Sequence, residues 1–322
     1  MAEKEDRYNL TSAMATAQSM SADEVLAAEK DLMTGPDSLQ MRIQLLSFYA
    51  LNQSADSFSE LKKHANWIAT KYSDVDSAVM LLCQAGLDFE NLERQWLDNA
   101  KSDNPRILQN ASLVFRYAKP RIAIAALERL CGLEPTHWEH PATLASILKT
   151  SDAGKALDFI EQALTLTDDT QSKLHVLTVA TEIAYGTANL EKAAFYAEQM
   201  VHCAPSISAI SAYGVFLAHS VLGRVAIHDQ DLNEAARQLL LSVELEEVSQ
   251  MRFRVPDLEL AQELLNRGRV SEVCDFLLAA QIIWPNLKEK FESLIKDIRK
   301  GNLPVLSSGI GAALFTGKVP EN

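Results

Sequence analysis

The chain has 322 residues, of which 48% are hydrophobic, and only 12 are glycine and 10 are proline. This composition is typical of a packed helical protein and argues against an intrinsically disordered one. The formal net charge is −13, and residues 1–103 hold 17 acidic but only 9 basic side chains. An acidic balance opposes nonspecific binding to phosphate backbones and anionic lipid, so we expect no nucleic acid and no membrane insertion.

The cysteines and the amino-terminal residues indicate in which cellular compartment the protein is located. Cys83, Cys131, Cys203 and Cys274 are far apart in apolar helical runs, without a Cys-x-x-Cys pair. We therefore expect buried free thiols in a reducing environment. The first eight residues are polar and unlike a signal peptide, and no run approaches the roughly 18 apolar residues of a membrane span. The sequence predicts a cytoplasmic protein.

Residues 1–35 are predicted to form a leader with one helix, from Ser21 to Met33. Ser21 and Glu24 have the spacing of a capping box, and Gly35 with Pro36 ends the helix.

Residues 36–103 are predicted to form divergent helical hairpins. The first hairpin pairs a helix over Leu39–Leu51 with one that carries Phe58 to Tyr72. A second, less regular hairpin is expected over residues 75–100. Neither hairpin has a distinctive sequence signature.

From residue 104 the chain repeats one pattern. Each second helix is expected to open on a small or apolar residue, and the residues four and seven positions later fall on the same helix face. The five opening residues are Ala123, Ala156, Ala193, Ala235 and Val273. Three of them are followed after twelve positions by a proline that ends the helix, namely Pro135, Pro205 and Pro285. The intervals between openers are 33, 37, 42 and 38 residues, so the connecting loops differ in length.

The repeat is clearest at Leu222-Gly223, where a polar turn leads to Ala235 and a second helix. A side chain at Gly223 would hold the partner helix away, so we expect two helices to cross closely there. On this view Gly223→Leu would overpack the contact, whereas Gly223→Ala would be nearly neutral or mildly stabilising.

This pattern resembles the tetratricopeptide repeat (TPR), in which Leu-Gly is paired with a later Ala and a closing Pro over about 34 residues. The resemblance covers residues 104–286 well and 39–103 weakly. It implies an all-α fold, a right-handed superhelical solenoid of antiparallel helix hairpins with irregular repeat length. Residues 287–300 are then expected to be a capping helix, and 301–322 a tail that contains Gly and Ser. A non-repetitive helical bundle is the alternative.

The resemblance also implies a function, that of a protein- or peptide-binding scaffold or adaptor rather than an enzyme. The alternative is a helical domain or subunit of an enzyme such as a transferase, which would need a deep pocket with convergent polar groups. The family's groove positions correspond here to Phe115, Arg116, His175, Glu182, Tyr185, Ser220, Arg224, His228, Gln262 and Asn266. Arg224 and Tyr185 are expected to be exposed and to contribute most to binding.

Three further features suggest chemistry. His137 and His140 could begin a metal site, but spacing identifies no third ligand, so we expect a surface loop and no metal or cofactor. The glycines of Gly309–Val319 lack the spacing of a phosphate-binding loop. Basic residues gather near the last repeat, either as a solvated rim or as a contact for an acidic partner or for the chain's own acidic first third. They are Arg252, Arg254, Arg267, Arg269, Lys288, Lys290, Lys296, Arg299 and Lys300.

Overall fold

The computed structural model describes residues 10–52, 55–71, 97–117, 119–203, 210–245, 251 and 256–306. Regular structure in these ranges is helical throughout, without a β-strand, and most consecutive helices within each compact unit pack against each other. The predicted all-α class is therefore confirmed. The chain divides into two compact units, Met1–Ile147 and Leu148–Asn322, which are described separately below.

The first unit begins with two helices where the sequence predicts one. They are α1 (Leu10–Ser19) and α2 (Ala22–Thr34), and α1 packs against a later helix of the same unit, α3. The helix α2 is the predicted one. It starts on the predicted capping box, because the Glu24 N–H donates to Ser21 Oγ and the Ser21 N–H donates to the Glu24 carboxylate at 2.7 Å. The additional helix α1 has a short, weakly amphipathic sequence, which explains why periodicity alone does not indicate it.

The predicted first hairpin is present as α3 (Leu39–Leu51) and α4 (Ala55–Lys71), which pack against each other. A buried polar network joins this pair to α2. The His64 side chain is fully buried, with Nε2 2.6 Å from Glu29 Oε1 and Nδ1 3.4 Å from Arg42 Nη1. Because Arg42 can only donate, His64 Nε2 carries the hydrogen and donates to Glu29. Burial lowers the pKa of His64, which favours this neutral form.

Three more helices complete the first unit, and they belong to the predicted repeat region. They are α7 (Pro105–Phe115), α8 (Pro120–Leu133) and α9 (Glu139–Leu148). Asn104 caps α7 by accepting from the Arg106 N–H at 3.0 Å, and Pro105 occupies the first turn, where no N–H is needed. The hairpin expected over residues 75–100 lies almost entirely outside the described residues.

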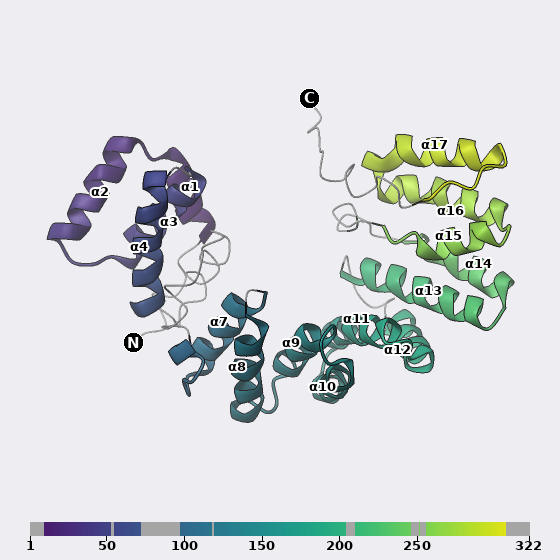
Figure 1. The fold of residues 1–322 in the computed structure, drawn as a ribbon, viewed down its shortest axis with the longest axis horizontal. Helices are drawn as coiled ribbons and strands as arrows, with labels where there is room; N and C mark the ends of the chain where they lie inside the picture. Colours follow the sequence, from purple (N-terminus) through teal and green to yellow (C-terminus); the bar gives the residue numbers. More distant parts are fainter. Residues whose placement is uncertain are drawn as a thin grey trace. The chain divides into compact units, whose positions relative to one another are not determined.

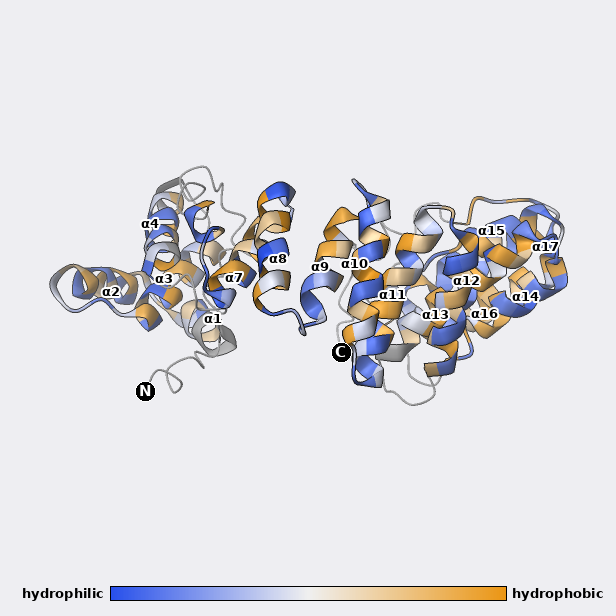
Figure 2. Cartoon of the chain, turned by 90° about the horizontal axis from the view of Figure 1, so that it is seen from below, coloured by the Kyte–Doolittle hydropathy of each residue, from blue (hydrophilic) through white to orange (hydrophobic). Residues whose placement is uncertain are grey.

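The second unit continues the alternation of first and second helices (Figure 1). It contains α10 (Ala153–Leu166), α11 (Thr170–Gly186), α12 (Leu190–Cys203), α13 (Ile210–His228), α14 (Leu232–Leu241), α15 (Glu259–Asn266), α16 (Val270–Ile283), the short 3-10 helix η3 (Pro285–Leu287) and α17 (Lys288–Arg299). In Figure 2 the helices α11 to α16 carry both hydrophobic and hydrophilic residues. The hydrophobic residues supply the contacts between neighbouring helices.

The five second helices, α8, α10, α12, α14 and α16, share one burial pattern. The residue predicted to open each helix is instead its fourth residue, so every second helix begins three residues earlier than expected. This residue is fully buried in every case. The residues four and seven positions later are at most 2% exposed: Leu127 and Leu130, Ile160 and Ala163, Ala197 and Met200, Leu239 and Ser242, and Leu277 and Ala280. The spacing read from the sequence therefore predicts the packed face of all five helices correctly.

The helix α17 is amphipathic as predicted, with Phe291, Leu294, Ile295 and Ile298 buried. After it the chain returns to α15, where Leu306 is fully buried and its N–H donates to Gln262 Oε1 at 2.8 Å. The rest of the tail, including Gly309–Val319, lies outside the described residues.

The described ranges bear on two predictions, one on membrane-spanning helices and one on the cysteines. None of the helices in these ranges has the length and apolar character needed to cross a bilayer. Cys131, Cys203 and Cys274 are free thiols, but only Cys274 is buried and the other two are partly exposed. The fourth cysteine, Cys83, is not among the described residues.

Candidate functional site

The residue predicted to dominate the groove, Arg224, is buried instead of exposed. Its side chain is 7% exposed, and Nη2 lies 2.8 Å from both carboxylate oxygens of Asp257 and 2.8 Å from Glu259 Oε2. The guanidinium also lies over the Tyr185 ring, 5.0 Å from its centroid. Burial alone would lower the pKa of Arg224, but the charges of Asp257 and Glu259 outweigh burial and raise it. Arg224 thus links α11, α13 and the start of α15.

The sequence of α13 explains why Arg224 is buried. The helix is apolar around most of its circumference and packs against α11, α12, α14 and α15. A helix of this kind is buried on several sides and has no free face at its centre. Ser220, also predicted to face a groove, is therefore only 4% exposed.

Phe115 is another predicted groove residue that the structure places in the core. It is fully buried together with Leu108 and Ala111, which precede it by seven and four positions on the same face of α7. These three residues form the packed stripe of the helix.

The remaining predicted residues are of two kinds. Glu182 and Gln262 are held by other parts of the chain: Glu182 accepts from Tyr213 Oη at 3.1 Å and from Lys149 Nζ at 3.3 Å, and Gln262 accepts from the Leu306 N–H. Arg116 is partly exposed, and His175, His228 and Asn266 are exposed. These exposed residues lie on different helices: His175 is on α11, His228 ends α13 and Asn266 ends α15.

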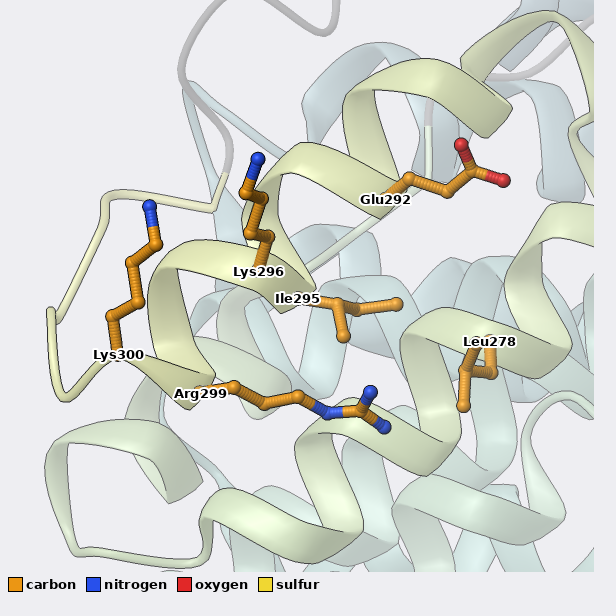
Figure 3. Close-up of a pocket in the computed structure, with 6 residues that line it drawn as sticks. All are labelled: Leu278, Glu292, Ile295, Lys296, Arg299 and Lys300. Atoms are coloured by element: carbon orange, nitrogen blue, oxygen red, sulfur yellow. The ribbon is translucent and has the colours of Figure 1, made fainter.

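A more open surface lies between α16 and α17 (Figure 3). It is a groove of about 450 Å³, lined by Leu278, Glu292, Ile295, Lys296, Arg299 and Lys300. In Figure 3 the Ile295 and Arg299 side chains extend from α17 toward Leu278 on α16. Leu278 is 45% exposed and Ile282, one turn further along α16, is 74% exposed. The surface therefore offers an apolar strip with a cationic edge.

The charges of this groove differ from those of the neighbouring basic residues. Arg267 and Arg269 pair with Glu263 and Glu272, at 3.5 and 2.8 Å. Within the described part of the chain, Lys296, Arg299 and Lys300 have no ion-pair partner, and all three are exposed. Arg252 and Arg254 lie outside that part. Lys288, at the start of α17, pairs with Glu292 at 4.0 Å. The basic cluster read from the sequence thus divides into paired residues and a free set at the C-terminal end of α17.

A third ligand, which spacing in the sequence does not identify, accompanies His137 and His140. Glu134, at the end of α8, has Oε2 2.8 Å from His140 Nε2, and one donor atom from each of the three residues lies within 4.8 Å of the others. The sequence pattern of the two histidines does not reveal this carboxylate, because Glu134 lies before the turn. Only the folded turn brings its side chain next to His140.

Glu29, Glu60 and His64 form a second group of possible metal ligands, but the ammonium group of Lys63 lies among them. Lys63 Nζ lies 3.1 Å from Glu29 Oε2 and 2.8 Å from Glu60 Oε2. The ammonium group thus neutralises the carboxylates that would have to bind a metal ion.

Comparisons with known proteins provide no family for this chain. No protein-family model matches the sequence, and a search of curated proteins found no similar sequence.

Proposed function

We propose that this protein is a helical-repeat scaffold that binds another protein, with a fold similar to the right-handed superhelix of TPR arrays. The observation that carries this proposal is the shared register of the five second helices, in which the fourth residue is always fully buried. A repeated register of this kind is typical of solenoid proteins, in which each hairpin packs on its neighbours, and it supports the proposal for this reason. Such arrays commonly serve as binding surfaces rather than as catalysts.

The binding surface that we propose is the groove between α16 and α17. Leu278 and Ile282 provide exposed apolar area, and free cations on α17 border it. An apolar strip beside unpaired positive charge complements an acidic segment with one or two apolar anchors. We therefore propose an acidic, amphipathic segment of another protein as the partner, and Arg224, which is buried, is not part of this binding surface.

The experiment is affinity capture from a native extract, with bound proteins identified by mass spectrometry and their affinity then measured on the purified partner. The double variant Lys296→Gln/Arg299→Gln is expected to weaken binding about tenfold or more, because it removes charge that faces the partner. Ile282→Ala is expected to weaken it about fivefold or more, since truncation of an apolar anchor costs above about 1 kcal/mol.

The control is Arg121→Gln, which removes one exposed positive charge on α8, a helix that does not line the groove. All variants should keep the wild-type far-ultraviolet circular dichroism and melting temperature, because they change exposed side chains. A partner that binds the groove variants as tightly as wild type would exclude this groove. Failure to recover any stoichiometric protein would argue against the scaffold itself.

A further inference from the structure

The turn between α8 and α9 brings three metal-ligand side chains together. Glu134, His137 and His140 follow one another at intervals of three residues. His140 Nε2 lies 2.8 Å from Glu134 Oε2, and the two imidazole rings stack with centroids 5.5 Å apart and an interplanar angle of 21°. One donor atom from each residue lies within 4.8 Å of the other two. The three donor atoms therefore lie close to one another.

Backbone hydrogen bonds fix this arrangement. The Glu134 N–H donates to Leu130 O at 2.8 Å and ends α8, and the His137 N–H donates to Glu134 O at 3.1 Å and closes a turn. His140 is the second residue of α9, so the helix sets its position. A site whose ligands are already held by turns and helix ends loses little conformational entropy when it binds an ion.

The three ligands differ in exposure in a way that suits ion entry. The His140 side chain is 7% exposed, whereas those of Glu134 and His137 are 32% and 57% exposed. One ligand is thus anchored in the protein and two reach the surface. Glu139 lies close by, with Oε2 3.8 Å from His137 Nδ1, and supplies additional negative charge.

We propose that Glu134, His137 and His140 bind one divalent transition-metal ion, with Zn²⁺ as the ion that best fits the donors. Two imidazole nitrogens and one carboxylate oxygen are a ligand set that zinc accepts, with water in the fourth position. Bonds of about 2.1 Å in a tetrahedral site place ligand atoms about 3.4 Å apart. The Glu134–His140 pair, now 2.8 Å apart, has to widen by about 0.6 Å to reach this spacing, and rotation of the exposed His137 side chain adjusts the third ligand.

The competing explanation is that Glu134 and His140 form only a hydrogen bond that stabilises the turn. That explanation assigns no role to His137, whose side chain is more than half exposed. The two explanations therefore differ at His137: it is essential to a metal site and dispensable to the hydrogen bond. Because His137 is exposed, its replacement by alanine should not prevent folding.

The test is isothermal titration of the full chain, freed of metal by a chelator, with ZnCl₂. We expect one equivalent to bind to wild type, and His137→Ala to weaken this binding about tenfold or more, as loss of a ligand should exceed the effect of losing an outer-shell partner. The matched control, His228→Ala, removes another exposed histidine on α13 and should bind Zn²⁺ as wild type does.

A second measurement uses the melting temperature. Zn²⁺ should raise that of wild type and of His228→Ala, because a ligand that binds only the folded state stabilises it, and it should leave His137→Ala unchanged. Absence of stoichiometric Zn²⁺ binding to wild type would overturn the proposal. Equal affinity in wild type and His137→Ala would do so as well, because the ion would then be bound elsewhere.

Discussion

At the scale of the residue, Arg224 shows that the position of a residue in a sequence repeat does not determine whether the folded chain buries it. The sequence pattern places Arg224 next to Gly223 on a first helix, which predicts exposure toward a groove. Its partners, Asp257 and Glu259, come from the loop and first turn of the next repeat. Loops follow no helical period, so no spacing argument could have placed these carboxylates over Arg224.

We predict that Arg224→Ala lowers the free energy of unfolding by about 1–3 kcal/mol. The change removes a buried charge-assisted contact to Asp257 and the packing of the guanidinium on Tyr185. The loss should stay below the 3–5 kcal/mol of a fully buried pair, because Asp257 and Glu259 are 38% and 74% exposed and regain water. Urea denaturation with an unchanged m-value measures the effect.

Glu259→Ala provides the comparison for Arg224→Ala, because it removes the more exposed of the two partners. Its effect should be below about 1 kcal/mol, as is usual for exposed ion pairs. If Arg224→Ala were as stable as wild type, Arg224 would be a surface residue after all, and its predicted role in a groove would return.

At the scale of the element, Gly223 confirms the predicted close approach of helices and corrects its consequence. A Cβ at this position would overlap Leu260 Cδ2 and lie 3.3 Å from Gln238 Cβ. Gly223 therefore faces α14 and α15 together, whereas the Leu-Gly pattern indicates only the following helix of the same hairpin. The contact with α15 depends on the packing of successive repeats, which one repeat of sequence does not encode.

We predict that Gly223→Ala is destabilising by up to about 2 kcal/mol instead of nearly neutral. A methyl group must displace Leu260, which is 2% exposed, and overpacking costs about 1–3 kcal/mol. The gain in helix propensity, about 1 kcal/mol, offsets part of this cost. Gly223→Leu should cost more than Gly223→Ala. Thermal and urea denaturation of both variants measure these differences.

Gly132 in α8 is the matched control, since a Cβ there meets nothing within 4 Å. Gly132→Ala should be neutral or stabilising by up to about 1 kcal/mol. The double variant Gly223→Ala/Leu260→Ala should lose most of the penalty of Gly223→Ala, because the displaced side chain is gone. Additive effects of the two substitutions would show that Leu260 is not the obstacle.

At the scale of the whole molecule, periodicity predicts the helices but not the surfaces between them. Spacings of four and seven residues fix the packed face of each second helix, and α3 was predicted to the residue, as Leu39–Leu51. The groove between α16 and α17 and the turn at Glu134 could not be predicted. The groove depends on side chains that meet only after two helices have packed, and the Glu134 cluster depends on the exact course of a turn.

The repeat interpretation makes a prediction that extends over several helices. Ala156 in α10 and Ala193 in α12 are both the fourth residue of a second helix and are fully buried. Ala156→Leu and Ala193→Leu should each lower the free energy of unfolding by about 1–3 kcal/mol, because a larger side chain overpacks the contact between helices. Urea denaturation followed by far-ultraviolet circular dichroism measures both values.

The controls for this prediction introduce the same leucine at exposed positions of the same helices, Asp158→Leu in α10 and Glu198→Leu in α12. These changes should stay within about 0.5 kcal/mol of wild type, as surface substitutions usually do. If both helices pack on their neighbours in one repeated register, Ala156→Leu and Ala193→Leu should lower the free energy of unfolding by similar amounts. The control variants should leave it unchanged. A loss at only one opener would mean that the two positions are not equivalent, and the fold would then be a non-repetitive helical bundle.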